Sequence, residues 1–141
     1  MSQPLSIKWI IIGASVIGGL NWVLRTVLAE PLLIPLIESM GVSVGALVFV
    51  LIVQLGSFFL GGLGVAYASP GNTIKEPAIA ATVAVAVNAA HYAVTTHDFS
   101  PVGIAIAIAM AYAFALAGAH LGERLQGDTT DKMRERGELR R

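Results

Sequence analysis

Four polar side chains lie inside long apolar stretches of this sequence, and their chemistry raises the first functional question. Asn21 and Gln54 fall in separate apolar runs, and Asn88 and His91 fall together in a third. Hydrocarbon cannot hydrogen-bond such groups, so polar residues at membrane depth are rare and often mark pathways for ions, protons or solutes. Amide and imidazole groups of this kind could form a polar pathway or a small binding site.

These four residues could also meet in space. Asn88 and His91 are three residues apart, which places them on one face of a helix. A cluster drawn from three helices would then join this pair to Asn21 and Gln54. The alternative is that the side chains only hydrogen-bond across helices and hold them together, at about 0.6 kcal/mol per interaction. That interpretation is favoured, because the apolar runs offer no embedded carboxylate to couple proton or cation movement.

The composition indicates which elements position these residues. Of the 141 residues, 55% are hydrophobic and only 13% are charged, and the mean hydropathy is +0.74. Soluble domains carry roughly 25% charged residues. A chain with so few charges cannot cover a water-exposed surface, so the sequence predicts an integral membrane protein.

Four apolar runs have the length of a membrane span, which is roughly 20 helical residues. They cover residues 7–28, 42–68, 77–95 and 102–122. The first is predicted to be a retained span and not a cleaved signal, because Trp22 and Arg25 are atypical of a signal peptide. The expected fold is all-α: a four-span bundle in a transmembrane domain of residues 1–126, followed by a charged tail of residues 127–141.

A short helix is expected between the first two spans, in the stretch "EPLLIPLIESMG". Joining this stretch to the second span would make a helix too long for the bilayer, and Gly41 offers a break. The large apolar residues of the stretch can share one face while Glu38 and Ser39 point elsewhere. These features favour a helix that lies in the outer membrane interface, and a re-entrant segment is the alternative.

The basic residues predict the orientation, since lysine and arginine accumulate in cytoplasmic loops. Lys8 precedes most of the first span, Lys75 lies between the second and third, and six cations lie at or after Arg124. Only Arg25 falls on the opposite side. Both termini are therefore predicted to be cytoplasmic, in a multi-pass protein of a bacterial inner membrane.

The polar stretch between the second and third spans is predicted to be a turn followed by a helix start. Ser69, Pro70 and Gly71 have strong turn propensity. Thr73 and Glu76 have the spacing of a capping box, in which each side chain covers an exposed backbone N–H of the other. The stretch lacks the pattern of a phosphate-binding loop, so capping is favoured over ligand binding.

Small residues recur at four-residue spacing and predict close helix packing. Gly18, Gly19 and Gly61 belong to such pairs in the first two spans. The fourth span carries two alanine ribbons on nearly opposite faces, and Ala109 and Ala113 form the middle of one of them. Such a span could be contacted from both sides, within the bundle and by another protein.

Several functional classes are disfavoured by the residues present. The chain has no cysteine, and its formal net charge of zero gives no basic face for nucleic acid. His91 and His120 differ in predicted depth by roughly 15–20 Å, too far to share a haem iron. No nucleophile with a matching base is visible, so we expect neither an enzyme nor a metal or other cofactor.

The sequence thus favours a small polytopic membrane protein that acts through helix packing. Its expected partners are the lipid bilayer and either further copies of itself or other membrane proteins, to which it would be an accessory subunit. The alternative is a small channel or carrier that uses the polar level of Asn21, Gln54, Asn88 and His91.

Overall fold

The computed structural model describes residues 5–69, 74–96 and 100–126, and the described residues form helices joined by short connections. The long helices are α1 (Ile7–Leu28), α3 (Val42–Ala68), α4 (Lys75–Thr96) and α5 (Pro101–Gln126). Each is long and apolar enough to cross a membrane. The predicted all-α, four-span membrane fold is confirmed. The predicted tail, residues 127–141, lies outside the described residues.

The segment between α1 and α3 is helical and continues directly from α1. A π-helical turn, η1 (Ala29–Leu33), leads into the short helix α2 (Ile34–Met40). Pro31 lies in this turn and has no N–H for the regular hydrogen bond, which explains why the helix widens there. Gly41 ends α2 with a φ of +82°, a conformation that glycine adopts without strain.

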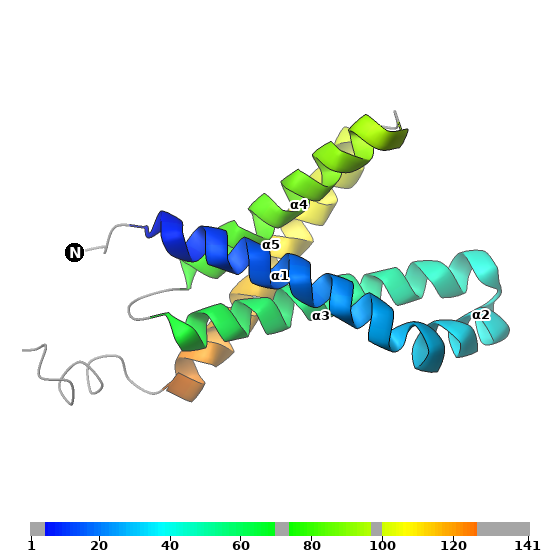
Figure 1. Ribbon diagram of the computed structural model, residues 1–141, viewed down its shortest axis with the longest axis horizontal. Helices are drawn as coiled ribbons and strands as arrows, with labels where there is room; N and C mark the ends of the chain where they lie inside the picture. Colours follow the sequence, from blue (N-terminus) through cyan, green and yellow to red (C-terminus); the bar gives the residue numbers. More distant parts are fainter. Residues whose placement is uncertain (1–4, 70–73, 97–99, 127–141) are drawn as a thin grey trace, which may run out of the picture.

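The helix α2 packs back against the start of α3. A Cβ atom added to Gly45 would lie 2.6 Å from the carbonyl carbon of Leu36, so the two backbones are in direct contact. This contact explains why α2 turns toward α3 at the end of α1 (Figure 1).

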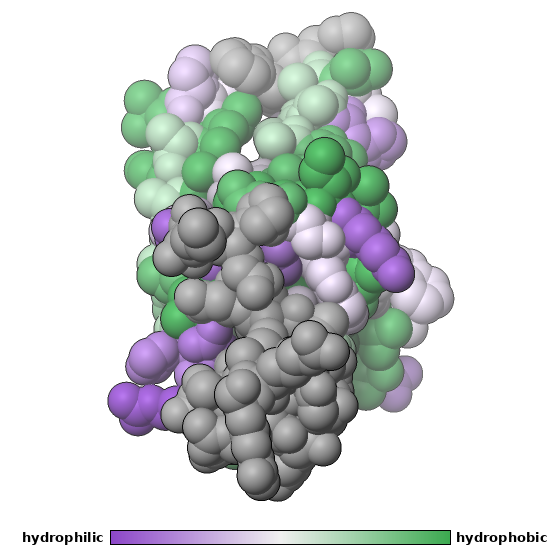
Figure 2. Space-filling view, turned by 90° about the vertical axis from the view of Figure 1, so that its left-hand side faces the viewer, coloured by the Kyte–Doolittle hydropathy of each residue, from purple (hydrophilic) through white to green (hydrophobic). Residues whose placement is uncertain are grey.

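The long helices form two hairpins that are joined at one end and diverge at the other (Figure 1). We call the joined end, where α1 and α4 begin and α3 and α5 finish, the closed end. The opposite end, which contains the connection between α4 and α5, is the open end. Lys8, Lys75 and Arg124 lie toward the closed end. Viewed from that side, hydrophilic side chains adjoin the hydrophobic surface of the helices (Figure 2).

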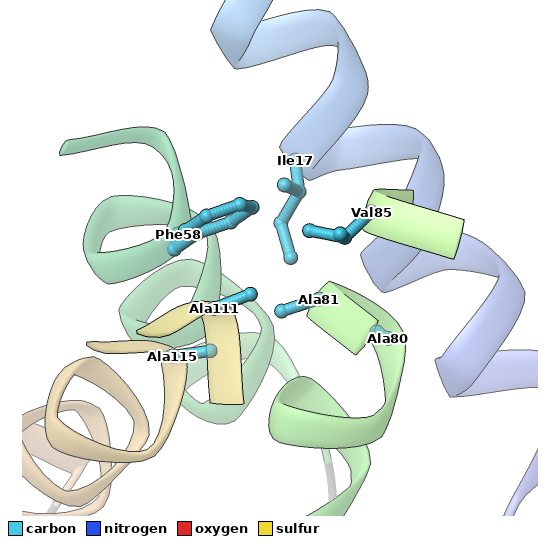
Figure 3. Close-up of a cluster of buried hydrophobic side chains, with 7 residues drawn as sticks. All are labelled: Ile17, Phe58, Ala80, Ala81, Val85, Ala111 and Ala115. Carbon is cyan, nitrogen blue, oxygen red and sulfur yellow. The ribbon is translucent and has the colours of Figure 1, made fainter. Parts of the chain in front are cut away.

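The core lies in the closed half of the bundle, and its buried cluster combines three larger side chains with four alanines. Ile17 of α1 is 1% exposed and points between Phe58 of α3 and Val85 of α4 (Figure 3). Ala111 and Ala115 of α5 complete the cluster with Ala80 and Ala81 of α4. Methyl side chains let the helices approach closely, as is usual where helices pack inside a membrane.

Helices α3 and α5 approach most closely, through glycines on both sides. A Cβ on Gly62 would collide with the Ala115 backbone, and a Cβ on Gly118 would collide with the Phe59 carbonyl oxygen. One turn later, a Cβ on Gly122 would lie 2.6 Å from the Leu63 carbonyl oxygen. The closed end is therefore packed backbone against backbone.

The small residues singled out in the sequence occupy both inner and outer faces. Gly61 is buried against Ile17. By contrast, Gly18 and Gly19 are exposed, and an added Cβ would meet nothing within 4 Å. Ala109 and Ala113 are exposed on α5. The other α5 ribbon faces inward, with Ala111, Ala115 and Ala119 at 0% exposure.

Candidate functional site

A cleft of about 420 Å³ lies between the two hairpins in the open half of the molecule. All four long helices contribute to it, because the helices that are in contact at the closed end separate toward the open end. The lining residues are Arg25, Val50, Leu51, Gln54, Leu55, Phe58, Val85, Asn88, Ala89, Tyr92, Gly103, Ile104, Ile106, Ala107 and Met110. The volume falls within the range of small-molecule sites in proteins, about 300–1,000 Å³.

The lining combines apolar walls with a few hydrogen-bonding groups. Aliphatic and aromatic side chains form most of the surface, and the polar groups are two amides, the Tyr92 phenol and the Arg25 guanidinium. A predominantly apolar pocket with a small number of polar groups is the usual composition of a ligand site. No acidic side chain is among the lining residues, so Arg25 gives the described lining a positive charge.

A polar network lies beside the cleft and holds α1 to α3. The Asn21 side-chain amide donates to Gln54 Oε1 at 3.0 Å and to the Ser57 hydroxyl oxygen at 3.2 Å. The Ser57 hydroxyl in turn donates to the Gln54 backbone carbonyl at 2.8 Å. Gln54 also lines the cleft, so this network fixes one polar wall of the cleft in position.

Three of the four residues of the predicted polar level lie in or beside the cleft, and His91 does not. Asn21 and Gln54 are hydrogen-bonded to each other, and Gln54 and Asn88 both line the cleft. His91 is exposed and is not among the lining residues. On a helix, a separation of three residues leaves a rotation of about 60° between side chains, enough to turn His91 out of the cleft.

Ser57 and Tyr92 belong to this region but were not among the polar candidates predicted from the sequence. Ser57 is 0% exposed and lies three residues after Gln54, on the same face of α3. Tyr92 lies four residues after Asn88, on the same face of α4. The spacing from the polar residues was therefore the available signal for both.

At the closed end, Glu76 makes a contact that differs from simple capping of its own helix. Its Oε1 accepts a hydrogen bond of 2.7 Å from the backbone N–H of Ser6, the residue that precedes α1. Glu76 is 6% exposed, and none of the described residues donates to its Oε2. A glutamate of α4 thus takes the place that a capping-box glutamate within α1 would occupy.

The remaining residues of the predicted turn are only partly described. Ser69 is buried at the end of α3, where its N–H donates to the Val65 carbonyl oxygen at 2.9 Å. Pro70, Gly71 and Thr73 lie outside the described residues, and with them the Thr73 half of the predicted capping box.

Comparison with known proteins adds no relative on which to base a function. No protein-family model, curated protein or solved structure matches this chain.

Proposed function

We propose that this protein binds a small molecule of the membrane in the cleft, as a carrier or a binding protein. The observation that carries the proposal is the convergence of Arg25, Gln54 and Asn88, from three helices, on one apolar-walled cleft. Amide groups at membrane depth are unfavourable against hydrocarbon unless they have polar partners. A ligand with a polar group would provide such a partner in the cleft.

The packing of the closed end favours a binding protein or a carrier over an open channel. Gly62 and Gly118 have no room for even a methyl group, so the α3–α5 contact is closed to water in this conformation. Passage between α3 and α5 would require these two helices to move apart. The polar groups of the cleft are amides, a phenol and a guanidinium without a paired nucleophile and base, which supports binding over catalysis.

Filling the cleft tests this function. Ala89 is partly buried in the lining, whereas its neighbour Ala90 is exposed and outside it. We expect Ala89→Phe to reduce photo-crosslinking of a neutral, diazirine-bearing lipid in nanodiscs by about tenfold, because the ring occupies the space of the ligand. Ala90→Phe should label like the parent. Equal labelling of all three proteins, or adducts that map outside the cleft, would contradict the proposed function.

Assembly with another copy is the second candidate function, and the outer face of α5 favours it. Ala105, Ala109, Ala113 and Ala117 form a ribbon that is exposed along the described helix. Small residues on an outer face allow another helix to approach closely. An accessory subunit of a larger complex would use the same surface.

The two alanine ribbons allow a direct test of assembly. The double variant Ala109→Ile, Ala113→Ile should retain the parent's melting temperature and lose at least tenfold in self-association, because bulk on a tight contact costs about 1–3 kcal/mol per site. Crosslinking in mild detergent measures the association. Ala111→Ile, on the inward ribbon, should instead lower the melting temperature. If the outward variant associates like the parent, the ribbon is a lipid-facing surface and the assembly proposal is wrong.

We further propose that the closed end faces the cytoplasm of a bacterial cell. The described cations support this orientation, because Lys8, Lys75 and Arg124 lie toward the closed end and Arg25 lies in the open half. Labelling a cysteine introduced at Gln126 from either side of the membrane measures the orientation. Labelling from outside would show that the closed end faces away from the cytoplasm.

A further inference from the structure

We propose that the ligand of the cleft is an anionic phospholipid, with its phosphate on Arg25 and an acyl chain along the apolar walls. This inference rests on the proposed function of the cleft and specifies its ligand. It follows from the charge of the lining, the depth of Arg25 and the charges of the surrounding helices.

The polar part of the lining is suited to an anion. Arg25 contributes a guanidinium with five N–H donors, which can bind phosphate oxygens in pairs. Gln54 Oε1 already accepts from Asn21, which leaves the Gln54 amide nitrogen as the donor on that wall. Tyr92 and Asn88 add a hydroxyl and a second amide, and no carboxylate competes for these donors in the described lining.

Arg25 also lies at the right depth for a lipid headgroup. It is 18 residues beyond Ile7, the first residue of α1, and therefore roughly 27 Å along the helix axis. The hydrocarbon core of a bilayer is about 30 Å thick. If α1 begins at one interface, Arg25 is close to the opposite one, and Phe58 and Met110 extend the apolar walls toward the middle of the bilayer.

A second copy of the chain is a poorer occupant, because its spans cannot neutralise Arg25. The described residues of α1 and α3 include no aspartate or glutamate, and the acids of α4 and α5, Glu76 and Glu123, lie at the closed end. Glu30 and Glu38 are exposed on η1 and α2, beyond the spanning part of α1. An anionic lipid supplies the missing charge at the depth where Arg25 lies.

The proposal is tested by measuring lipid preference in nanodiscs that contain phosphatidylcholine and phosphatidylglycerol. Spin-labelled or photoactivatable forms of each lipid report binding at the cleft. The parent should prefer phosphatidylglycerol by about tenfold, the ratio that corresponds to roughly 1.4 kcal/mol. Arg25→Gln should bring this ratio close to one, and Arg25→Lys should retain part of it because the charge remains.

Lys8→Gln provides the matched control, since Lys8 is an exposed cation of the same helix at the closed end. It should keep the parent's preference, whereas an equal loss in both variants would show a general surface effect and overturn the proposal. Arg25 is exposed, so Arg25→Gln should fold like the parent, which its melting temperature verifies.

The outcomes separate this inference from the function on which it rests. If both lipids label the cleft equally and Ala89→Phe abolishes the labelling, the anionic preference is wrong and the binding function stands. If neither lipid labels the cleft, both fail. If a photo-crosslinker placed at position 25 instead captures a second copy of the chain, the occupant of the cleft is protein and the lipid proposal is overturned.

Discussion

Replacing Gly118 with isoleucine is expected to destabilise the fold by about 3 kcal/mol, the upper end of the usual range for overpacking. The reason is the contact of α5 with the backbone of α3. A Cβ at this position would collide with the Phe59 carbonyl oxygen and would lie 3.1 Å from the Leu63 amide nitrogen. Backbone atoms cannot rotate away as a flexible side chain does, so the helices would have to separate. Denaturant titration in mixed micelles measures the change.

The neighbouring residue provides the control for this substitution. Ala117 is exposed on the outer face of α5, and Ala117→Ile adds bulk with no inward contact. It should unfold within about 0.5 kcal/mol of the parent, as is usual for surface substitutions. A Gly118 variant as stable as the Ala117 variant would contradict the close α3–α5 contact.

Replacing Glu76 with alanine is expected to destabilise the closed end by about 2 kcal/mol. Hydrogen bonds to charged groups contribute roughly 1.5–3 kcal/mol, and this one joins the Ser6 N–H of α1 to α4. The carboxylate also lies at the N-termini of two helices, where the helix dipoles favour a negative charge. Hydrogen exchange of the first turn of α1 should report the loss directly.

Two further variants separate the contact from the charge. Glu76→Gln keeps an oxygen acceptor and should lose less stability than Glu76→Ala. Glu38→Ala removes an exposed carboxylate of α2 and should leave the first turn of α1 protected. If Glu76→Ala were as stable as the parent, burying the carboxylate would cost as much as its hydrogen bond contributes.

The membrane spans were predictable because their signal is composition over about 20 residues, and it does not depend on packing. The spans of α1 and α3 agree with the predicted residues 7–28 and 42–68. The short helix α2 was also expected, but its fusion to α1 through a π turn was not. That detail depends on the Pro31 backbone and on the contact of Leu36 with Gly45, which joins separate elements.

The rotation of each helix about its own axis could not be predicted. Both alanine ribbons of α5 have the same spacing, and packing against the other helices, such as the contact of Ala115 with Gly62 of α3, decides which one faces inward. The same limit applies to the polar residues. The sequence placed Asn88 and His91 on one face, but the described packing leaves Asn88 in the cleft lining and His91 outside it. Which of two nearby residues faces a cleft depends on contacts with helices that are distant in the sequence.

The glycine contacts of the closed end also determine how far the distant end of α5 would move if the helix rotated about them. From Ala115, at the contact with Gly62, to Pro101, at the first turn of α5, the helix extends 14 residues, or roughly 21 Å. A rotation of about 10° around that contact would displace the tip of α5 by roughly 4 Å and hardly move the glycines. A small rotation at the glycine contact therefore produces a larger displacement at the open end. The distance between the two hairpins at the open end thus depends on contacts at the closed end.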